Sequence, residues 1–137
     1  VGTEYRIGTY IYNDRSLIMR GTCEIKDCAL TILATVVSTP TPNRAVIDAG
    51  SKSLTSDLSG LSGYGLVVGH PDLTIEKLSE EHGCIISDNP TGLKVGQQVH
   101  VIPNHACVVS NLVDHVVFTR QQKPVKTQPV IARGQVW

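Results

Sequence analysis

The chain has 137 residues, which is enough for one domain with a buried core but short for a catalytic domain joined to a cofactor domain. Its 12 Lys and Arg residues balance its 12 Asp and Glu residues, so the charge predicts neither a nucleic-acid partner nor binding to an anionic membrane surface. No apolar run approaches the roughly 20 residues that a membrane-spanning helix needs. Aromatic residues are few and Val, Ile and Thr are plentiful, which favours strands over helices.

The first residue bears on whether the chain is part of a longer polypeptide, and the cysteines bear on the redox compartment in which it folds. It begins at Val1, its only methionine is Met19, and no charged-then-apolar signal peptide opens it. We therefore expect a piece of a longer polypeptide. The four cysteines form no C-x-x-C pair, so we expect free thiols in a reducing compartment and a cytoplasmic location.

Short apolar runs, separated by Gly and Pro, predict a mainly β fold built as a compact barrel or sandwich. The predicted strands, in chain order, span residues 5–12, 17–23, 29–38, 44–48, 65–68, 73–78, 84–86, 98–102, 116–119 and 129–137. Residues 53–63 predict a loop with one helical turn, and the polar stretch 121–128 predicts a mobile loop. Residues 108–113 are too few for periodicity to decide between a helix and a strand.

The run VIPNHAC, residues 101–107, is the most informative motif because it places His105 and Cys107 two residues apart after a Pro-Asn turn. Both side chains can offer a lone pair to a borderline-soft divalent metal such as zinc. Two ligands leave coordination positions open, which is typical of a catalytic rather than a structural metal site. Cysteine is also among the most buried residue types, so the spacing alone leaves a structural interpretation open.

Two other polar clusters are weaker candidates. His82 follows two glutamates and could carry a proton or orient a metal-ligating group, although a surface loop that ends at Gly83 explains the same residues. Residues 48–52 (DAGSK) follow a predicted strand and suit a binding loop, with Lys52 in a solvated salt bridge rather than in a Schiff base. The glycines of residues 63–69 do not have the spacing of a dinucleotide-binding fingerprint.

Seven motifs occur in an order that is specific in combination. They are RIGTYIYND (6–14), CALTILATVVS (28–38), DAGSK (48–52), GYGLVVG (63–69), LSEEHG (78–83), VIPNHAC (101–107) and ARGQV (132–136). With them, the chain resembles the C-terminal β domain of the D-threonine aldolase and eukaryotic-type D-serine dehydratase family. These are pyridoxal-phosphate enzymes of the alanine-racemase-like fold type. The resemblance implies a compact β-barrel of the alanine racemase C-terminal-domain type with short helical turns.

The resemblance also implies a division of labour. Residues 1–137 would be a single metal-binding β domain, and an N-terminal (β/α)8 barrel outside this chain would bind pyridoxal phosphate through a Schiff-base lysine. His105 and Cys107 would hold the divalent metal, with zinc favoured by the thiolate and manganese or magnesium as alternatives.

The implied activity is that of a lyase on D-3-hydroxy amino acids, an aldolase or a dehydratase, in a homodimer. The metal would bind the β-hydroxyl and the carboxylate of the substrate. The chain alone would have no pyridoxal chemistry. Two alternatives remain open, namely a folding or dimerisation domain without chemistry and a racemase-type domain of the same fold.

Overall fold

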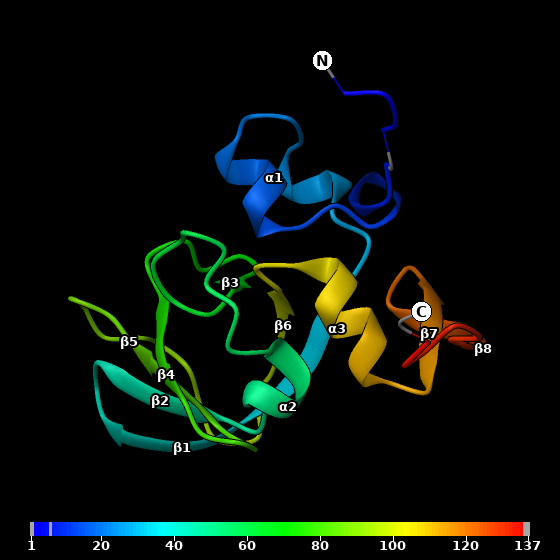
Figure 1. Ribbon diagram of the computed structural model, residues 1–137. Helices are drawn as coiled ribbons and strands as arrows, with labels where there is room; N and C mark the ends of the chain where they lie inside the picture. The colour runs from blue at the N-terminus through cyan, green and yellow to red at the C-terminus, as the bar shows by residue number, and fades with distance from the viewer. Residues whose placement is uncertain (1, 6, 136–137) are drawn as a thin grey trace.

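The computed structural model describes residues 2–5 and 7–135 (Figure 1). Val1, Arg6, Val136 and Trp137 lie outside the described residues. The first residue of the RIGTYIYND motif, the last residue of the ARGQV motif and the end of the predicted strand 129–137 are therefore among the positions without a structural description.

Six antiparallel strands form one nearly closed, barrel-shaped sheet in the order β3-β6-β1-β2-β5-β4. The strands are β1 (Ile32–Thr41), β2 (Arg44–Ile47), β3 (Leu66–Val67), β4 (Thr74–Leu78), β5 (Gly83–Ile86) and β6 (Gln98–Ile102). The two edge strands approach each other, since the backbone N–H of Tyr64, just before β3, donates to the carbonyl oxygen of Ile75 in β4 at 3.0 Å. The prediction of a mainly β barrel is confirmed.

The core lies inside this barrel and is made by alternate residues of its strands. Each fully buried Val or Ile contributes about 1.5–3 kcal/mol relative to an exposed side chain, so the inward faces hold the sheet closed. The register keeps these residues opposite one another, as in the pair Val36 and Ile47. The inward residues of the six strands are Ala34, Val36, Ala45, Ile47, Val67, Ile75, Ile85, Val99 and Val101.

The described residues before β1 (2–5 and 7–31) contain no strand, so the predicted strands 5–12 and 17–23 are wrong. This part of the chain contains the 3₁₀ turns η1 (Thr9–Ile11) and η2 (Ile25–Asp27) and the helix α1 (Arg15–Met19). The alternation of apolar residues marks no buried face there, because Tyr5, for example, is 80% exposed. Asp14 starts α1 by accepting a hydrogen bond from the backbone of Leu17 at 3.1 Å, as an N-cap residue does.

Two further short helices lie against the barrel (Figure 1). α2 (Ser51–Leu54) is the helical turn predicted near residues 53–63, although it begins two residues earlier. α3 (Ala106–Leu112) settles the undecided segment 108–113 as a helix and starts inside the VIPNHAC motif. At 7 residues α3 is the longest helix in the described part of the chain, and none there is long and apolar enough to cross a membrane.

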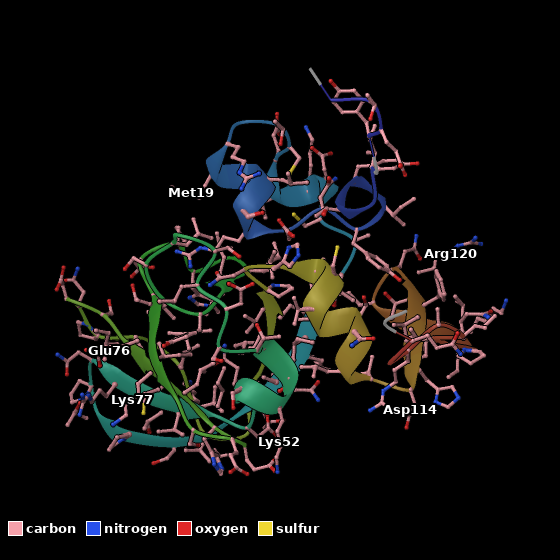
Figure 2. All side chains as sticks on the ribbon, viewed as in Figure 1. Met19, Lys52, Glu76, Lys77, Asp114 and Arg120 are labelled. Carbon is pink, nitrogen blue, oxygen red and sulfur yellow. The ribbon has the colours of Figure 1, made fainter. Side chains whose placement is uncertain are left out.

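A separate hairpin of β7 (His115–Arg120) and β8 (Lys123–Pro129) follows α3 and stands away from the barrel (Figure 1). The predicted loop 121–128 and strand 129–137 are therefore wrong, because β8 ends at Pro129 and a turn follows. Two residues with positive φ, Gln121 and Gln122, make the hairpin turn, beside Arg120 at its tip (Figure 2). The strands are mostly exposed on both faces, so they lack the alternation that marks a half-buried strand.

Candidate functional site

The two predicted metal ligands lie where the chain leaves the barrel and enters α3. His105 is the N-cap residue of α3 in extended backbone conformation, and Cys107 lies in the first turn. The His105 side chain is 30% exposed and Cys107 is exposed. In the described residues, no group of three or more His, Cys, Asp or Glu side chains is arranged to hold a metal ion. The site therefore offers at most two protein ligands from this short segment.

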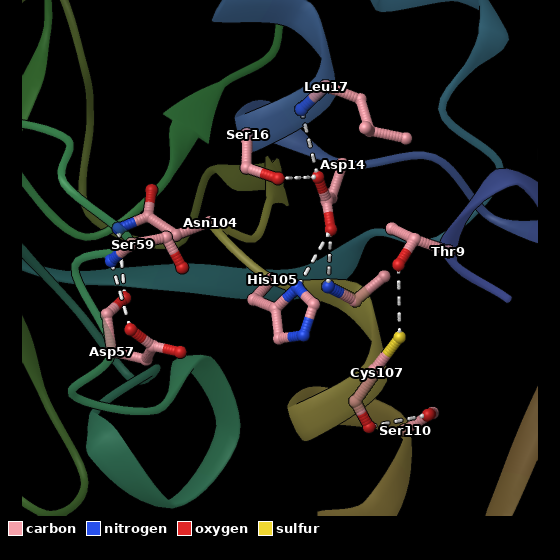
Figure 3. A network of polar contacts seen from close by, with 11 residues as sticks. Thr9, Asp14, Ser16, Leu17, Asp57, Ser59, Asn104, His105, Cys107 and Ser110 are labelled. Atoms are coloured by element: carbon pink, nitrogen blue, oxygen red, sulfur yellow. Dashed lines mark hydrogen bonds and ion pairs between the residues drawn. The ribbon is translucent and has the colours of Figure 1, made fainter. Parts of the chain in front are cut away.

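The carboxylate of Asp14 reaches His105 from the other end of the chain (Figure 3). Asp14 is fully buried, and its Oδ2 atom lies 3.2 Å from Nδ1 of His105. The same Oδ2 accepts the backbone N–H of Ala106 at 3.0 Å. Its other oxygen, Oδ1, accepts hydrogen bonds from the hydroxyl of Ser16 at 2.7 Å and from the backbone of Leu17 at 3.1 Å. One carboxylate thus joins the start of α1 to the start of α3.

The charge of Asp14 is stabilised by these donors. Burial alone would raise the pKa of the carboxyl group, because a low-dielectric site disfavours the ionised form. The hydrogen bonds from the Ala106 N–H, the Ser16 hydroxyl, the Leu17 N–H and His105 outweigh burial and hold the pKa below its ordinary value. Asp14 is consequently an ionised hydrogen-bond acceptor at neutral pH.

The N-terminal segment, defined here as residues 9–17, packs on the Pro103–Cys107 turn through further polar contacts. Thr9 Oγ1 lies 3.4 Å from the sulfur of Cys107 (Figure 3). The backbone N–H of Arg15 donates to the carbonyl oxygen of Pro103 at 3.1 Å, and that of Ser16 donates to the carbonyl oxygen of Asn104 at 3.2 Å. The site is therefore built from two segments about 90 residues apart in the sequence.

A second set of contacts fixes the turn itself. The buried amide of Asn104 donates to the carbonyl oxygens of Gly63 at 2.8 Å and Asp57 at 3.2 Å. The Arg15 guanidinium donates to Asn104 Oδ1 and to the carbonyl oxygen of Gly63, both at 3.1 Å. These hydrogen bonds join Asn104, the residue before His105, to Arg15 and to the loop before β3, so they hold the backbone from which the His105 side chain extends.

The sequence singled out His105 and Cys107 as candidates, but it did not single out Asp14, Arg15 and Asn104, which the structure brings next to them. An Asp placed just before an apolar run is a recognised helix N-cap signal, and that signal was available at Asp14. No sequence pattern connects Asp14 to His105, however, because the two residues are 91 positions apart.

The other candidate, His82, lies elsewhere, in a turn that packs on α2. Its backbone N–H donates to Ser79 Oγ at 3.1 Å and its carbonyl oxygen accepts the Ser79 N–H at 2.9 Å. Among the described residues, no hydrogen bond joins His82 to His105 or Cys107. Next to it, Lys52 forms ion pairs with Glu81 at 2.7 Å and Glu80 at 3.1 Å.

These ion pairs confirm the expected salt bridge of Lys52. The hydrogen bonds from Lys52 to Glu81 and Glu80 raise the pKa of the lysine. A lysine that forms a Schiff base needs the opposite shift, toward a neutral amine. The DAGSK segment, which includes the first two residues of α2, thus joins this helix to the turn at residues 79–82 through the ion pairs of Lys52.

Comparison with known proteins gives consistent matches over most of the chain. The family model described as "Putative serine dehydratase domain" matches residues 29–119. An uncharacterised protein of Mycobacterium tuberculosis is 38% identical over 128 residues, which cover 89% of this chain and 96% of that protein. D-serine dehydratase of Dictyostelium discoideum is 31% identical over 135 residues, which cover 87% of this chain and 34% of that enzyme.

The fold is also found in solved structures. The crystal structure of D-threonine aldolase from Filomicrobium marinum superposes with a TM-score of 0.80 and 28% identity, over 95% of this chain and 36% of that enzyme. The chain thus spans nearly all of the mycobacterial relative but only about a third of the two named enzymes. The family model covers well over half of the chain, and the relatives confirm the resemblance that the motifs indicated. The chain belongs to the putative serine dehydratase domain family.

Proposed function

We propose that this domain is the metal-binding part of a pyridoxal-phosphate-dependent lyase that acts on D-3-hydroxy amino acids, with His105 and Cys107 as its protein ligands. The single observation that carries the proposal is the contact of 3.2 Å between the buried carboxylate of Asp14 and Nδ1 of His105. Histidines that bind metals almost always donate their second ring N–H to a carboxylate, a carbonyl or water. Such a partner distinguishes His105 from an ordinary surface histidine.

The names of the relatives support the substrate class. They are a D-serine dehydratase, a 3-hydroxy-D-aspartate aldolase of Paracoccus denitrificans and a D-threonine aldolase of Arthrobacter. The amino acids in these names share D configuration and a hydroxyl group on the β-carbon. We extend that shared chemistry to the substrate of the enzyme to which this domain contributes.

The ligand assignment is supported by a further relative. D-threo-3-hydroxyaspartate dehydratase has been solved with a histidine replaced by alanine, and with a cysteine two positions later replaced by alanine in a metal-free form. The cysteine variant superposes on this chain with a TM-score of 0.77 and 25% identity. His105 and Cys107 have the same order and the same spacing in this chain.

The donor set fits zinc better than the alternatives. An imidazole nitrogen and a thiolate are ligands that zinc prefers, whereas magnesium and manganese favour carboxylates, carbonyls and water. With two protein ligands, the remaining positions would be open to water and to the hydroxyl and carboxylate oxygens of the substrate. Pyridoxal phosphate, bound by an N-terminal barrel domain, would supply the electron sink for charge at the α-carbon.

The residues of this chain would orient that metal and limit its movement. Asp14 holds the His105 ring, and Thr9 contacts the Cys107 sulfur. Arg15 and Asn104 fix the turn that carries both ligands. A homodimer, in which the barrel and β domains of two subunits meet, belongs to the same proposal.

The test is an activity assay on the enzyme that joins this domain to its barrel. D-threonine and D-serine are supplied separately, and aldehyde, ammonia and the L-isomer are each followed. We expect aldehyde or ammonia from the wild-type enzyme, and losses of 100-fold or more (on the order of the losses that follow removal of a residue central to catalysis) in His105→Ala and Cys107→Ala. L-isomer alone would indicate the racemase alternative. Unchanged activity in both variants would contradict the proposed role of the two ligands.

A second candidate function is supported by the mycobacterial relative, of which this chain spans 96%. The 128 matched residues make up 96% of the mycobacterial protein, whereas a (β/α)8 barrel alone needs about 250 residues, so that relative has no room for one. We propose as the alternative an interaction domain without pyridoxal chemistry of its own. Sedimentation of the 137-residue chain, alone and mixed with an isolated barrel domain, distinguishes the two: self-association without barrel binding would favour the alternative.

A further inference from the structure

We propose that Asp14 is a positioning residue of the candidate metal site: its carboxylate holds His105 in the tautomer with hydrogen on Nδ1, which leaves the lone pair of Nε2 for a metal. This inference rests on the proposed function, because it assigns a role toward the same site. It goes further by adding a residue outside the segment 29–119 that the family model matches. It also makes the N-terminal segment a part of the site.

Contacts within the protein alone fix the position of the Asp14 carboxylate. Asp14 is 0% exposed, and each of its oxygens has two partners. Oδ1 accepts from Ser16 and Leu17 within the same helix start, and Oδ2 accepts from the Ala106 N–H and faces His105 Nδ1 (Figure 3). Two of these donors are backbone N–H groups of helix starts, so the carboxylate cannot turn away from His105 without leaving them unpaired.

The Asp14 carboxylate determines which ring nitrogen of His105 carries the hydrogen. An ionised carboxylate has no hydrogen to donate, so the short contact with Nδ1 requires that Nδ1 carry the hydrogen. A neutral imidazole then has its only free lone pair on Nε2, the nitrogen on the far side of the ring from Asp14. The ionised form of Asp14 is stabilised by the hydroxyl of Ser16 and by the backbone N–H groups of Leu17 and Ala106, which all donate to its carboxylate.

The N-terminal segment brings Asp14 into place through contacts that do not involve the imidazole. Arg15 and Ser16 donate their backbone N–H groups to the carbonyl oxygens of Pro103 and Asn104. Thr9 lies against the Cys107 sulfur at 3.4 Å. The segment would therefore stay docked on the turn when the His105 ring is removed, and both ligands would lose a neighbour if the segment were removed.

The first experiment measures the tautomer directly in the metal-free 137-residue chain. Long-range ¹H–¹⁵N NMR correlations of the histidine rings are recorded at about pH 8, above the pKa of about 6.5 of free histidine. Signals of His105 are assigned by their loss in His105→Ala. We expect hydrogen on Nδ1, whereas hydrogen on Nε2 would overturn the inference.

The second experiment measures zinc affinity by calorimetry in the wild-type chain, in Asp14→Asn and in the control Asp27→Asn. Asp27 also accepts a backbone N–H at a helix start, from Glu24 at 2.9 Å, but it is exposed and belongs to η2. Loss of a carboxylate that orients a metal-binding histidine typically costs 10–100-fold in affinity, so we expect a loss of about that size in Asp14→Asn and none in the control. Equal affinities in the wild type and Asp14→Asn would overturn the inference.

The two measurements separate this inference from the proposed function. Absence of zinc binding by the wild-type chain, together with activity that does not depend on His105, would contradict the proposed function. Hydrogen on Nε2 in a wild-type chain that binds zinc, and that loses this zinc in His105→Ala, would contradict the inference while the ligand assignment stands. If Asp14→Asn does not fold, as circular dichroism would reveal, the tautomer of the wild-type chain decides the question by itself.

Discussion

Replacement of Gly50 by alanine is expected to destabilise the barrel, because the backbone leaves no room for a side chain. Gly50 lies between β2 and α2, against the turn at residues 79–82. A Cβ atom there would lie 2.5 Å from the carbonyl carbon of Glu80 and from the backbone nitrogen of His82, a separation that real Cβ atoms essentially never show. Because these neighbours are backbone atoms, no side-chain rotation can relieve the overlap.

The loss of stability can be worked out from the turn at residues 79–82, which must move to make room for the Cβ atom. The turn is held to α2 by hydrogen bonds from the backbone of Ser51 to Ser79 at 2.8 Å and from that of Lys52 to Glu80 at 3.1 Å. Overpacking costs about 1–3 kcal/mol, and each hydrogen bond that is lost adds about 0.5–1.5 kcal/mol, so the free energy of unfolding should fall by roughly 2–6 kcal/mol. Gly50 has φ −113°, so backbone strain adds nothing to this figure.

Urea denaturation followed by far-ultraviolet circular dichroism measures the effect. Gly8→Ala is the matched control, because Gly8 has φ −132° and an added Cβ would meet nothing within 4 Å. The control should stay within about 0.5 kcal/mol of the wild type, as surface substitutions usually do. If Gly50→Ala also stays within that range, the close packing between Gly50 and the turn at residues 79–82 is refuted.

Three further predictions concern other parts of the chain. Burial raises the pKa of Cys28 to about 12, so iodoacetamide at about pH 8 should alkylate the exposed Cys107 well before Cys28 in a mass-spectrometric time course; equal rates would contradict the burial of Cys28. Burial alone would raise the pKa of Asp14, but its hydrogen bonds hold that pKa below 3.8, so its contribution to stability is present above pH 3.8 and is lost as the pH falls through the lower folded-state value. Thermal melts across this range should therefore show a steeper acid loss in the wild type than in Asp14→Asn, and parallel curves would contradict the account. Truncation after Asp114 removes the exposed hairpin and no barrel core residue, so the barrel should keep a cooperative melting transition, and its loss would show that the hairpin supports the fold.

The sequence predicted the barrel strands well because burial of alternate side chains requires the alternating apolar residues that mark a strand. The segment 29–38 is rich in β-branched residues since alternate side chains of β1, such as Val36, fill the core. The N-terminal segment has a similar alternation, but its apolar residues are exposed, Ile7 at 78% and Tyr10 at 61%, so the same pattern there does not mark a strand. The hairpin was only half predicted: the expected strand 116–119 lies within β7, whereas β8 was expected as a loop, since its side chains are mostly solvated and show no alternation of buried residues.

The candidate site was predictable only where its residues are adjacent in the sequence. His105 and Cys107 lie two positions apart, so their chemistry is visible in the printed chain. Asp14 contributes through a contact across 91 positions, which depends on how the N-terminal segment docks on the turn after β6. That docking uses backbone hydrogen bonds, and any residue can make them.

The measurement that tests the central claim most directly is the zinc content of the 137-residue chain after equilibration with zinc and removal of the unbound ion. The account predicts about one equivalent in the wild type, since two protein ligands complete one tetrahedral site with water. His105→Ala and Cys107→Ala should each lose this zinc, and Cys84→Ala, which changes a half-buried cysteine of β5, should keep it. Equal zinc content in all four proteins would contradict the assignment of His105 and Cys107 as metal ligands.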